Sequence, residues 1–535
     1  MWSQTYTPIN GSLPLSTLVA ALPVIVLLVL LGILRVRSWL AALTGVVVAG
    51  VVALVAYGMP ATLVVSSALY GAAYGILPIG WIVFTAILLY KLTVETGKFE
   101  IIRSSVGGLT GDRRLQALLI AFAFGAFIEG AGGFGTPVAV SAAMLAGLGF
   151  EPFYAAAICL LANTAPVAFG SIGIPVVILA TVTQYPLDVL SSNIGRLCAP
   201  ISVIIPSYLV IVMSGWKGYR GVLPAALTCG FTFAAMQLFV SNVLGPYLTD
   251  ILSALAAIGA LVVLFKFWRP AGAPAATPHA HSTRDALMAW IPYAFLVIFV
   301  LLWGSTATKA ILDQVTVIFQ WPALHNQVQR VAPITTSPSP YGAMYTFNWL
   351  SASGTSALFA VLVAAAVLRV SPGKLATWTW ATAKQLALPQ LTICSMLALA
   401  YLMNYSGQTA TLALAFSETG GAFPFFSAML GWLGVFLTGS DASANALFGN
   451  LQIVTAERLG FNPALMAAAN SAGGVMGKMI SLQSIAIAVV AAGMHRSDEA
   501  RLFRFTLRHS IFLASIVGVL TLIYAYVVPG WMLQK

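Results

Sequence analysis

Charged side chains are scarce in this chain of 535 residues: they make up 7% of it, against roughly 25% in a typical soluble protein. Hydrophobic residues make up 60%, the mean hydropathy is +0.94, and apolar runs of roughly 20 residues recur, the length that crosses a bilayer. The sequence therefore predicts a polytopic membrane protein. The net charge of +11 does not indicate a nucleic-acid partner, because the lysines and arginines fall mostly in short loops, where they set membrane orientation.

Other features are rare or missing. His279 and His281 share a Pro/Ala-rich linker, where solvation is a better interpretation than metal binding. No GxxxxGK[ST] nucleotide loop occurs, so ATP-driven transport is unsupported. Neither a basic segment nor a small-residue cleavage site precedes the first apolar run, so we expect no removable signal peptide. The four cysteines are isolated inside apolar runs and predict neither disulfides nor a metal cluster: Cys159, Cys198, Cys229 and Cys394.

The apolar runs predict an all-α fold with about 12–14 spans. A run at 61–96 is too long for one straight span and is interrupted at 75–80, around Pro78. The other clear spans outside the central motifs of the two halves are expected at 14–35, 38–58, 195–215, 221–240, 248–267, 288–305 and 348–368.

Basic residues predict which loops face the cytoplasm. Arg35 and Arg37 mark the first turn as cytoplasmic, which places the N-terminus outside. A basic loop at 98–114 and the polar linker at 269–285 are expected on the cytoplasmic side as well. The long polar segment at 306–346 has few basic residues, so we expect it outside and partly ordered over the membrane.

An internal repeat links the two halves of the chain. GAFIEG at 125–130 matches GVFLTG at 434–439, and NTAPVAFG at 163–170 matches NSAGGVMG at 470–477. Further matches keep the same order: LGFEP at 148–152 with LGFNP at 459–463, Leu77-Pro78 with Leu388-Pro389, and Tyr90 with Tyr401. Ordered matches at a nearly constant offset predict two copies of one structural unit.

The charges give this repeat a direction. The basic loop at 98–114 corresponds to 409–424, which has no Lys or Arg, whereas 185–195 has none and corresponds to the Arg-rich segment 493–504. Matching segments on opposite sides of a membrane are typical of the inverted repeats of secondary transporters, whose sites lie near the bilayer midplane. A channel is the alternative, although no ring-forming filter sequence is present. We expect N-terminal spans (1–60), a first repeat (61–240), connecting spans with the linker and outer loop (241–368), and a second repeat (369–535).

Each repeat contains a stretch of residues that a simple spanning helix avoids. In the first, at 124–175, several glycines and Pro137 surround Glu129; the second has a matching stretch at 434–484. Backbone can leave a helix inside a bilayer only where it is buried in protein or lines a watery cavity. A glycine-rich break beside an acid therefore predicts a binding site. Close helix packing through small residues is the alternative.

Glu129 and Asp441 stand out among the fourteen Asp and Glu residues, since nearly all others are expected at span ends or in loops. A carboxylate removed from water can take up and release a proton near neutral pH, which proton coupling requires. A carboxylate that stays ionised can instead hold Na⁺ with backbone carbonyls. A structural acid is the further alternative, and SDASAN at 440–445 is also typical of a helix N-cap.

An anionic substrate needs positive potential, which the N-termini of half-helices supply. Lys478, in GGVMGKMIS, is the first candidate for a carboxylate partner, with a salt bridge to Asp441 as the alternative. Lys384, Lys91 and Arg196 are weaker candidates, because each side chain can extend to an interface. Further candidate substrate-binding groups, half of which can equally serve as helix caps, are Gly132, Gly133, Asn163, Thr164, Ser171, Ser440, Asn445, Asn470, Ser471 and Gln483.

The motifs resemble the signature segments of the bacterial lactate permease family: GAFIEGAGGFGTPVAV, NTAPVAFGSIGIP, GVFLTGSDASANALF and GGVMGKMISLQSIAIA. The resemblance covers nearly the whole chain; 269–346 aligns poorly, and Leu482 stands where the family's MISPQS has proline. It implies an inner-membrane symporter that imports L-lactate, often also D-lactate and glycolate, with protons. It also implies kinship with ion transporters that use paired re-entrant hairpins and often an elevator motion. Glu129, Asp441 and Lys478 match family positions.

The sequence thus predicts a proton-coupled monocarboxylate importer of the bacterial inner membrane. Glu129 and Asp441 are the expected proton-coupling groups, and Lys478 is expected to hold the carboxylate. The alternatives are a Na⁺-coupled or broader organic-anion carrier, an anion channel and a membrane sensor of lactate. We expect no cofactor beyond the coupling ion and no enzyme activity, since no nucleophile–base pair or metal set is visible. The sequence leaves open whether the protein forms a homodimer.

Overall fold

The computed structural model describes residues 1–133, 135–270 and 282–534. In these ranges, twelve helices are long and apolar enough to cross a membrane, or thirteen if one bent pair counts as a span. The predicted polytopic helical fold is therefore confirmed. The interpretation of His279 and His281 falls outside the described residues, as does most of the linker that contains them.

The first series of elements runs from the N-terminus to the end of the first expected core. It consists of β1 (Trp2–Ser3), α1 (Leu13–Gly32), α2 (Ser38–Val55), α3 (Ala61–Tyr74), η1 (Gly75–Gly80), α4 (Trp81–Glu95), α5 (Lys98–Gly107), α6 (Arg113–Gln116), η2 (Ala117–Phe124), α7 (Gly125–Ala131), α8 (Thr136–Gly147), α9 (Pro152–Ala162), η3 (Val167–Phe169), α10 (Gly170–Thr183) and α11 (Leu187–Arg220). Here η1 and η2 are π-helical turns.

The middle of the chain contains the connecting helices and most of the strands: α12 (Leu223–Val243), α13 (Thr249–Phe267), α14 (Thr283–Gly304), α15 (Thr306–Leu312), η4 (Asp313–Val315), β2 (Val317–Gln320), β3 (Val328–Arg330), β4 (Ser339–Tyr341), β5 (Met344–Phe347) and α16 (Ser353–Val367). The second series is α17 (Pro372–Ser406), α18 (Gln408–Ser417), η5 (Gly420–Ala422), α19 (Phe423–Thr438), α20 (Asp441–Leu459), α21 (Pro463–Lys478), α22 (Leu482–Ala491), η6 (Arg496–Asp498), α23 (Glu499–Tyr526) and η7 (Pro529–Trp531).

The order of elements in the first series recurs in the second. The interrupted helix α3–η1–α4 has its counterpart in the long helix α17, and the short helix α5 in α18. The segment from α6 to α7 corresponds to α19, and α8, α9, α10 and α11 correspond to α20, α21, α22 and α23. The sequence matches thus keep their order along the two series, although NTAPVAFG at 163–170 lies in the turn around η3 and its match NSAGGVMG at 470–477 lies inside α21.

Several expectations about individual elements need correction. The expected span at 195–215 is part of the much longer helix α11, which extends past both bounds and is interrupted at Gly215. The loop at 98–114 and its counterpart at 409–424 are mostly helical, as α5 and α18. The expected interruption of 61–96 is confirmed, because Leu77 inside η1 has non-helical dihedral angles.

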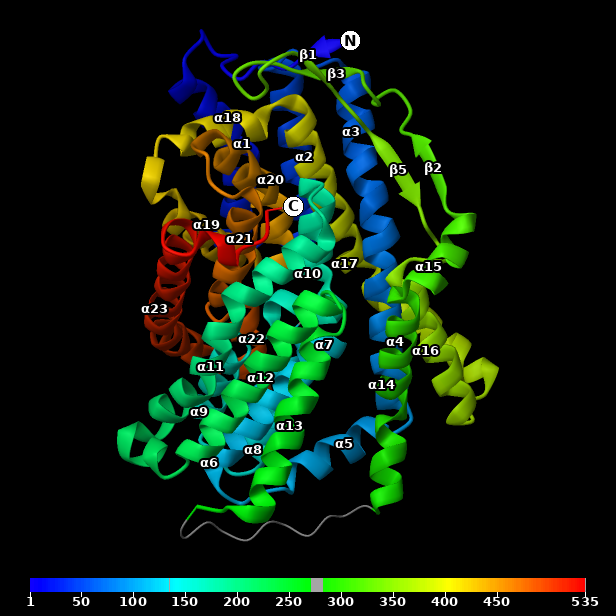
Figure 1. The fold of residues 1–535 in the computed structure, drawn as a ribbon, viewed down its shortest axis with the longest axis vertical. Helices are drawn as coiled ribbons and strands as arrows, with labels where there is room; N and C mark the ends of the chain where they lie inside the picture. Colours follow the sequence, from blue (N-terminus) through cyan, green and yellow to red (C-terminus); the bar gives the residue numbers. More distant parts are fainter. Residues whose placement is uncertain (134, 271–281, 535) are drawn as a thin grey trace.

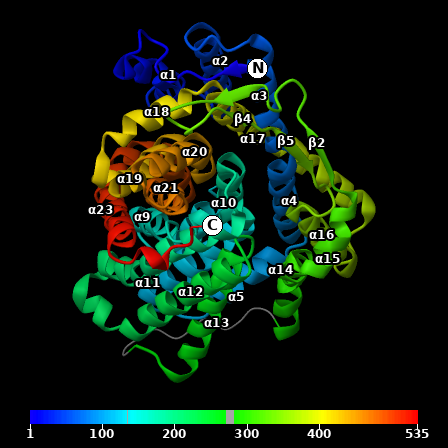
Figure 2. The same ribbon diagram turned by 45° about the horizontal axis from the view of Figure 1, so that its top comes forward.

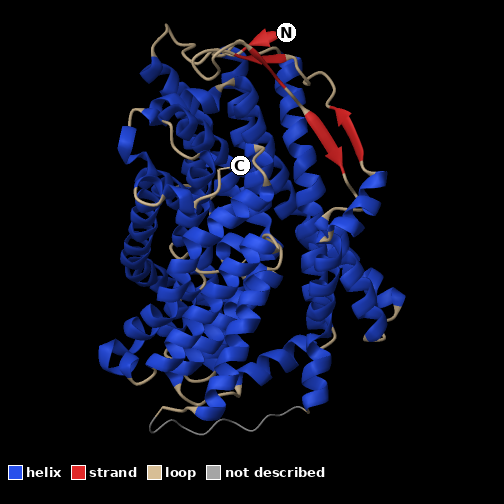
Figure 3. Cartoon of the chain, viewed as in Figure 1, coloured by secondary structure: helices blue, strands red, loops and turns tan. Residues whose placement is uncertain are grey.

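The polar segment at 306–346 is more ordered than the sequence suggested. β2 pairs with β5 in antiparallel register, and β3 pairs with β4 and, in parallel, with the N-terminal strand β1. Figures 1 and 3 show these strands at one end of the molecule, near the N-terminus, while the free ends of α13 and α14 lie at the opposite end. In Figure 2, α10, α20 and α21 lie toward the middle, with α3, α4, α19 and α23 around them.

Candidate functional site

A cavity of about 480 Å³ lies between the two helix breaks. The first break contributes Glu129, Gly170 and Ser171 to its wall, and the second contributes residues from Thr438 to Ser443 together with Lys478 and Gln483. Helix α17 adds Pro389 and its neighbours, and the turn between α1 and α2 adds Arg37. The two stretches that the sequence singled out therefore meet at one charged cavity.

Glu129 is positioned by the short helix α7 and is only 4% exposed. Its Oε2 accepts a hydrogen bond of 2.9 Å from the Asn163 amide at the end of α9. A Cβ added at Gly170 would lie 2.6 Å from Oε1, so glycine is needed there for the backbone to approach the carboxyl. The break thus holds Glu129 with one donor and a close backbone.

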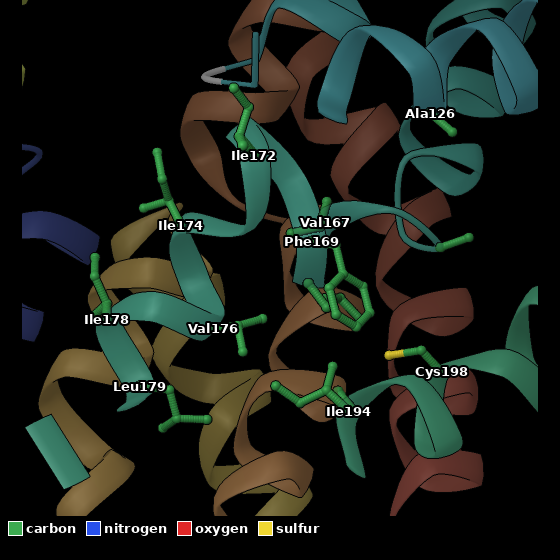
Figure 4. Close-up of a cluster of buried hydrophobic side chains, with 14 of the residues drawn as sticks. Ala126, Val167, Phe169, Ile172, Ile174, Val176, Ile178, Leu179, Ile194 and Cys198 are labelled. Carbon is green, nitrogen blue, oxygen red and sulfur yellow. The ribbon is translucent and has the colours of Figure 1, made fainter. Parts of the chain in front are cut away.

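The backbone of α10 turns sharply where it meets Glu129. Ser171, Ile172 and Gly173 all have φ between 49° and 72°, the left-handed region, and α9 and α10 are bent by 62° across the break. The Ser171 hydroxyl donates to the Gly132 carbonyl at 3.3 Å. Figure 4 shows a cluster of buried hydrophobic side chains on this segment, with Phe169 of the break near Ile194 and Cys198 of α11. Packing therefore holds most of this break in place.

The second break begins where α19 ends at Gly439 and α20 starts. Ser440 is the N-cap of α20, and its Oγ accepts from the Ser443 amide at 3.2 Å. Since Ser440 does the capping, the Asp441 carboxyl can turn into the protein, where it is 3% exposed. The N-cap alternative applies to Ser440 and not to Asp441.

Asp441 accepts hydrogen bonds at one carboxyl oxygen, and its Oδ1 has no hydrogen-bond partner in the described structure. Its Oδ2 accepts from the Ser471 hydroxyl at 2.6 Å and from the Asn445 amide at 3.4 Å. The same Asn445 amide also donates to the Pro175 carbonyl of α10 at 3.1 Å, which ties the second break to the first. Asn470 donates to the Asn445 side-chain oxygen at 2.9 Å and extends the network behind the cavity wall.

Lys478 is the last residue of α21, and its Nζ donates to the Gly439 carbonyl at 2.7 Å. The ion pairs in the described part of the chain are Arg103–Glu100 and Arg114–Asp112, so the alternative of a salt bridge to Asp441 is not realised. Lys478 nevertheless interacts electrostatically with both Glu129 and Asp441. It is the ammonium group shared by the two carboxyls on this cavity.

The candidate residues fall into two groups by position. Those on the cavity wall are Glu129, Ser171, Ser440, Asp441, Lys478 and Gln483. Behind the wall, Asn163, Asn445 and Ser471 contact the two carboxyls, Asn470 contacts Asn445, and Gly132 and Gly133 form the backbone around Ser171. The hydroxyl of Thr164 donates to the Leu161 carbonyl, which is a helix-end contact.

The weaker cationic candidates lie off this cavity. Arg196 donates to Asn242 and to the Trp531 carbonyl, and its guanidinium lies 5.2 Å from the centre of the Trp531 ring. It therefore ties α11 to the end of the chain. Lys91 and Lys384 are not among the residues that line the cavity.

The sequence reasoning missed two charged residues. Arg37 was assigned only to orientation, yet its side chain lines the cavity from the α1–α2 turn. Asp250 lies at a span end, as expected, in the first turn of α13, but it is 1% exposed and therefore as buried as Glu129 and Asp441. Nothing in the sequence indicated that Asp250 is buried, because it lies at the predicted start of a span and acids are common in the first turn of a helix.

A bundle of apolar spans with a charged cavity between two helix breaks has the architecture of a membrane transport protein. The family model described as L-lactate permease matches residues 16–528. The chain therefore belongs to the L-lactate permease family, a family of multi-pass bacterial membrane permeases rather than enzymes.

Two relatives match over essentially the full length. The chain is 44% identical to the glycolate permease GlcA of Escherichia coli K12 over 559 residues, which covers 100% of both chains. It is also 44% identical to the L-lactate permease of Bacillus subtilis strain 168 over 567 residues, covering 99% of this chain and 100% of the relative. Among solved structures, the Alcanivorax borkumensis YdaH transporter aligns at 14% identity over 89% of both chains, with a TM-score of 0.46.

Proposed function

We propose that the protein is a secondary active transporter that carries L-lactate, and also D-lactate and glycolate, into the cell together with protons. One observation carries this proposal: two buried carboxyls and one lysine line a single cavity between two helix breaks. The names of the two relatives, a glycolate permease and an L-lactate permease, support small 2-hydroxy acids as the substrates.

The charges on the wall explain why protons and an anion would travel together. With Glu129 and Asp441 ionised, the two carboxylates offset the positive charges of Lys478 and Arg37, so the wall offers an incoming anion no net positive charge. One added proton leaves the wall with one net positive charge, and a second proton leaves it with two. A carboxylate substrate would therefore bind best after protonation, because an uncompensated charge in an apolar interior is costly.

The polar groups on the wall suit a 2-hydroxy acid. Lys478 and the N-terminus of α20, where Ser440 and Ser443 line the cavity, supply positive potential for a carboxylate. Ser171 and Gln483 are side chains that can hydrogen-bond the substrate hydroxyl. A volume of about 480 Å³ is ample for lactate and also admits larger organic anions. The range of substrates is therefore an outcome of the test below.

We propose further that the two series of elements, within 61–240 and 369–535, are inverted repeats and that the N-terminus lies outside. A second cavity, of about 750 Å³, supports this arrangement. It is lined by Pro78 and Ile82, and the first cavity by Pro389 and Ile393, which are their repeat-related counterparts at the offset of 311. Cavities built from matching residues of two repeats are what alternating access requires.

The test is uptake of labelled L-lactate into proteoliposomes under an imposed pH gradient, inside alkaline and without sodium. We expect uphill uptake that a protonophore abolishes and that unlabelled D-lactate and glycolate inhibit. Uptake that requires sodium would replace the proton by Na⁺ and make Glu129 and Asp441 cation ligands. Flux that neither saturates nor accumulates substrate would indicate a channel. If no lactate is taken up under either a proton or a sodium gradient, lactate is not the substrate.

A further inference from the structure

Asp250 is the third buried acid of the membrane domain, and the cavity described above does not explain it. It lies in the first turn of α13, is 1% exposed, and neither carboxyl oxygen has a hydrogen-bond partner in the described structure. Leaving such a group unpaired in an apolar interior is costly, so each case calls for a functional explanation. The setting favours the neutral, proton-carrying form of the acid.

The described elements that pack against the helix of Asp250 include no cation. The elements that pack against α13 are α7, α10, α12 and η2, and none of them contains a lysine, arginine or histidine. Their titratable groups are Glu129 of α7 and Cys229 of α12, and Cys198 of α11 also interacts electrostatically with Asp250. Glu129 is the charged group that acts on Asp250. An ion pair therefore does not account for this acid.

Contact with α7 places Asp250 against Gly130, the residue that follows Glu129. A Cβ added at Gly130 would lie 2.8 Å from the Asp250 Cβ, so the absence of a side chain at Gly130 lets the two helices touch there. Glu129, the preceding residue of α7, lines the cavity of about 480 Å³, which Asp250 does not. The wall between Asp250 and the proposed substrate cavity is therefore a single short helix.

The residues shortly before Asp250 border the second cavity. Tyr247 and Leu248, just before α13, line the cavity of about 750 Å³, together with Thr346 of β5. The Pro246 carbonyl approaches Gly173 of the α10 break, where an added Cβ would lie 2.8 Å away. Asp250 thus follows Tyr247 and Leu248, which border the larger cavity, and packs against α7, whose Glu129 borders the smaller one.

We propose that Asp250 is a third proton-binding carboxyl, which relays the coupling proton between the larger cavity and Glu129. The proposal rests on the proposed proton-coupled function and adds a residue to it. In the relay step, the O–H bond of the Asp250 acid breaks as a new O–H bond forms on the Glu129 carboxylate, directly or through water. Asp250 is then re-protonated from the larger cavity, so that no net charge stays behind.

The experiment compares wild type, Asp250→Asn and Ser253→Ala in proteoliposomes. Ser253 is buried on the same helix and donates only to the Thr249 carbonyl, which makes it a matched control. Two rates are measured across pH: uphill lactate uptake under a pH gradient, and exchange at equal lactate on both sides. For Asp250→Asn we expect uphill uptake to fall by about tenfold or more and to lose its pH dependence, while exchange stays close to wild type.

The outcomes separate this inference from the function on which it rests. Wild-type uptake that ignores the pH gradient overturns the proposed proton coupling itself. If wild type is proton-driven but Asp250→Asn keeps its rate and pH profile, the relay is overturned alone. A parallel loss of exchange and uptake in Asp250→Asn, with Ser253→Ala normal, would assign Asp250 a structural role and also overturn the relay.

A second measurement serves if Asp250→Asn does not reconstitute. In the double variant Glu129→Gln/Asp441→Asn, the infrared spectrum is recorded in H₂O and D₂O. We expect a protonated-carboxyl band that shifts on deuteration, since Asp250 is then the remaining buried acid among the described membrane helices. A spectrum without such a band would overturn Asp250 as a proton-binding group.

Discussion

Glu129 in the first helix break accepts one hydrogen bond, from Asn163, whereas Asp441 in the second accepts two, from Ser471 and Asn445. The left-handed backbone of the α10 break packs against Glu129, while the Asn445 amide and the Ser471 hydroxyl donate to one oxygen of Asp441. A carboxyl with one donor gains and loses a proton with little rearrangement. A carboxyl fixed by several donors suits a positioning role more than a mobile one.

The two breaks also differ in how they carry positive charge. Lys478 belongs to the second break and donates to its Gly439 carbonyl, and the cavity-facing helix N-terminus is that of α20. The first break contributes no cation to the cavity wall among the described residues. The comparison suggests a division of labour, with the first break exchanging the proton and the second binding the anion.

The largest expected effect comes from removing the charge in the first break. Glu129→Gln keeps the size of the side chain and its contact with Asn163 but cannot carry a proton, so we expect proton-driven accumulation to be abolished and exchange to remain. Asp441→Asn is the matched variant in the second break, and we expect a weaker loss of accumulation. Uptake and exchange in proteoliposomes measure both variants; equal losses would remove the division between the two breaks.

The next effect tests the second break as the anion site. Lys478→Ala removes the ammonium on the cavity wall, so we expect lactate affinity to weaken by about 2 kcal/mol, or roughly 30-fold. The apparent affinity in exchange assays measures this change. Lys384→Ala is the control, because Lys384 does not line the cavity. An unchanged affinity in Lys478→Ala would make the lysine a structural partner of Gly439.

The positions of the breaks could be predicted from sequence for a physical reason. Glycines, a proline and an isolated acid inside an apolar run are costly in a bilayer unless the protein uses them, so GAFIEGAGGFG and GSDASAN stand out. The start of α22 was predicted less clearly, because Leu482 replaces the expected proline. In the structure Ser481 caps that helix and Leu482 takes its first position, so the break forms without proline.

Other features depend on contacts between distant segments and could not be predicted. Asn445 lies four residues after Asp441 on one helix, a spacing visible in the sequence, but the Ser471 contact comes from another helix. In the sequence Asp250 resembles an ordinary acid in the first turn of a helix, and its burial depends on the packing of α7 against α13. The strand pairing of β1 with β3 joins residues 2–3 to residues 328–329, and short polar segments give no sign of such a pairing.

The comparison of the two breaks can be tested by adding a methyl group at a glycine beside each carboxyl. A Cβ at Gly170 would lie 2.6 Å from Glu129 Oε1, and one at Gly474 would lie 2.4 Å from Asp441 Oδ1. Alanine at either position should cost about 1–3 kcal/mol through overpacking. We expect Gly170→Ala to alter the pH profile of uptake, because its neighbour Glu129 accepts only one hydrogen bond. We expect Gly474→Ala to lower thermal stability more than Gly170→Ala does. Gly259→Ala, with open space around it, is the control for both.

The smallest expected effect concerns the donors themselves. Asn163→Ala removes the single hydrogen bond to Glu129, whereas Ser471→Ala leaves Asp441 the Asn445 amide. A hydrogen bond to a charged group contributes about 1.5–3 kcal/mol, so the loss should fall most heavily where no second donor exists. We therefore expect Asn163→Ala to move the pH of half-maximal uptake upward, since without its donor Glu129 holds its proton to higher pH, and Ser471→Ala to move it less. Uptake rates across pH measure both shifts. A larger shift in Ser471→Ala would reverse the roles assigned to the two breaks, because it would make the hydrogen-bonded acid the one whose protonation limits transport.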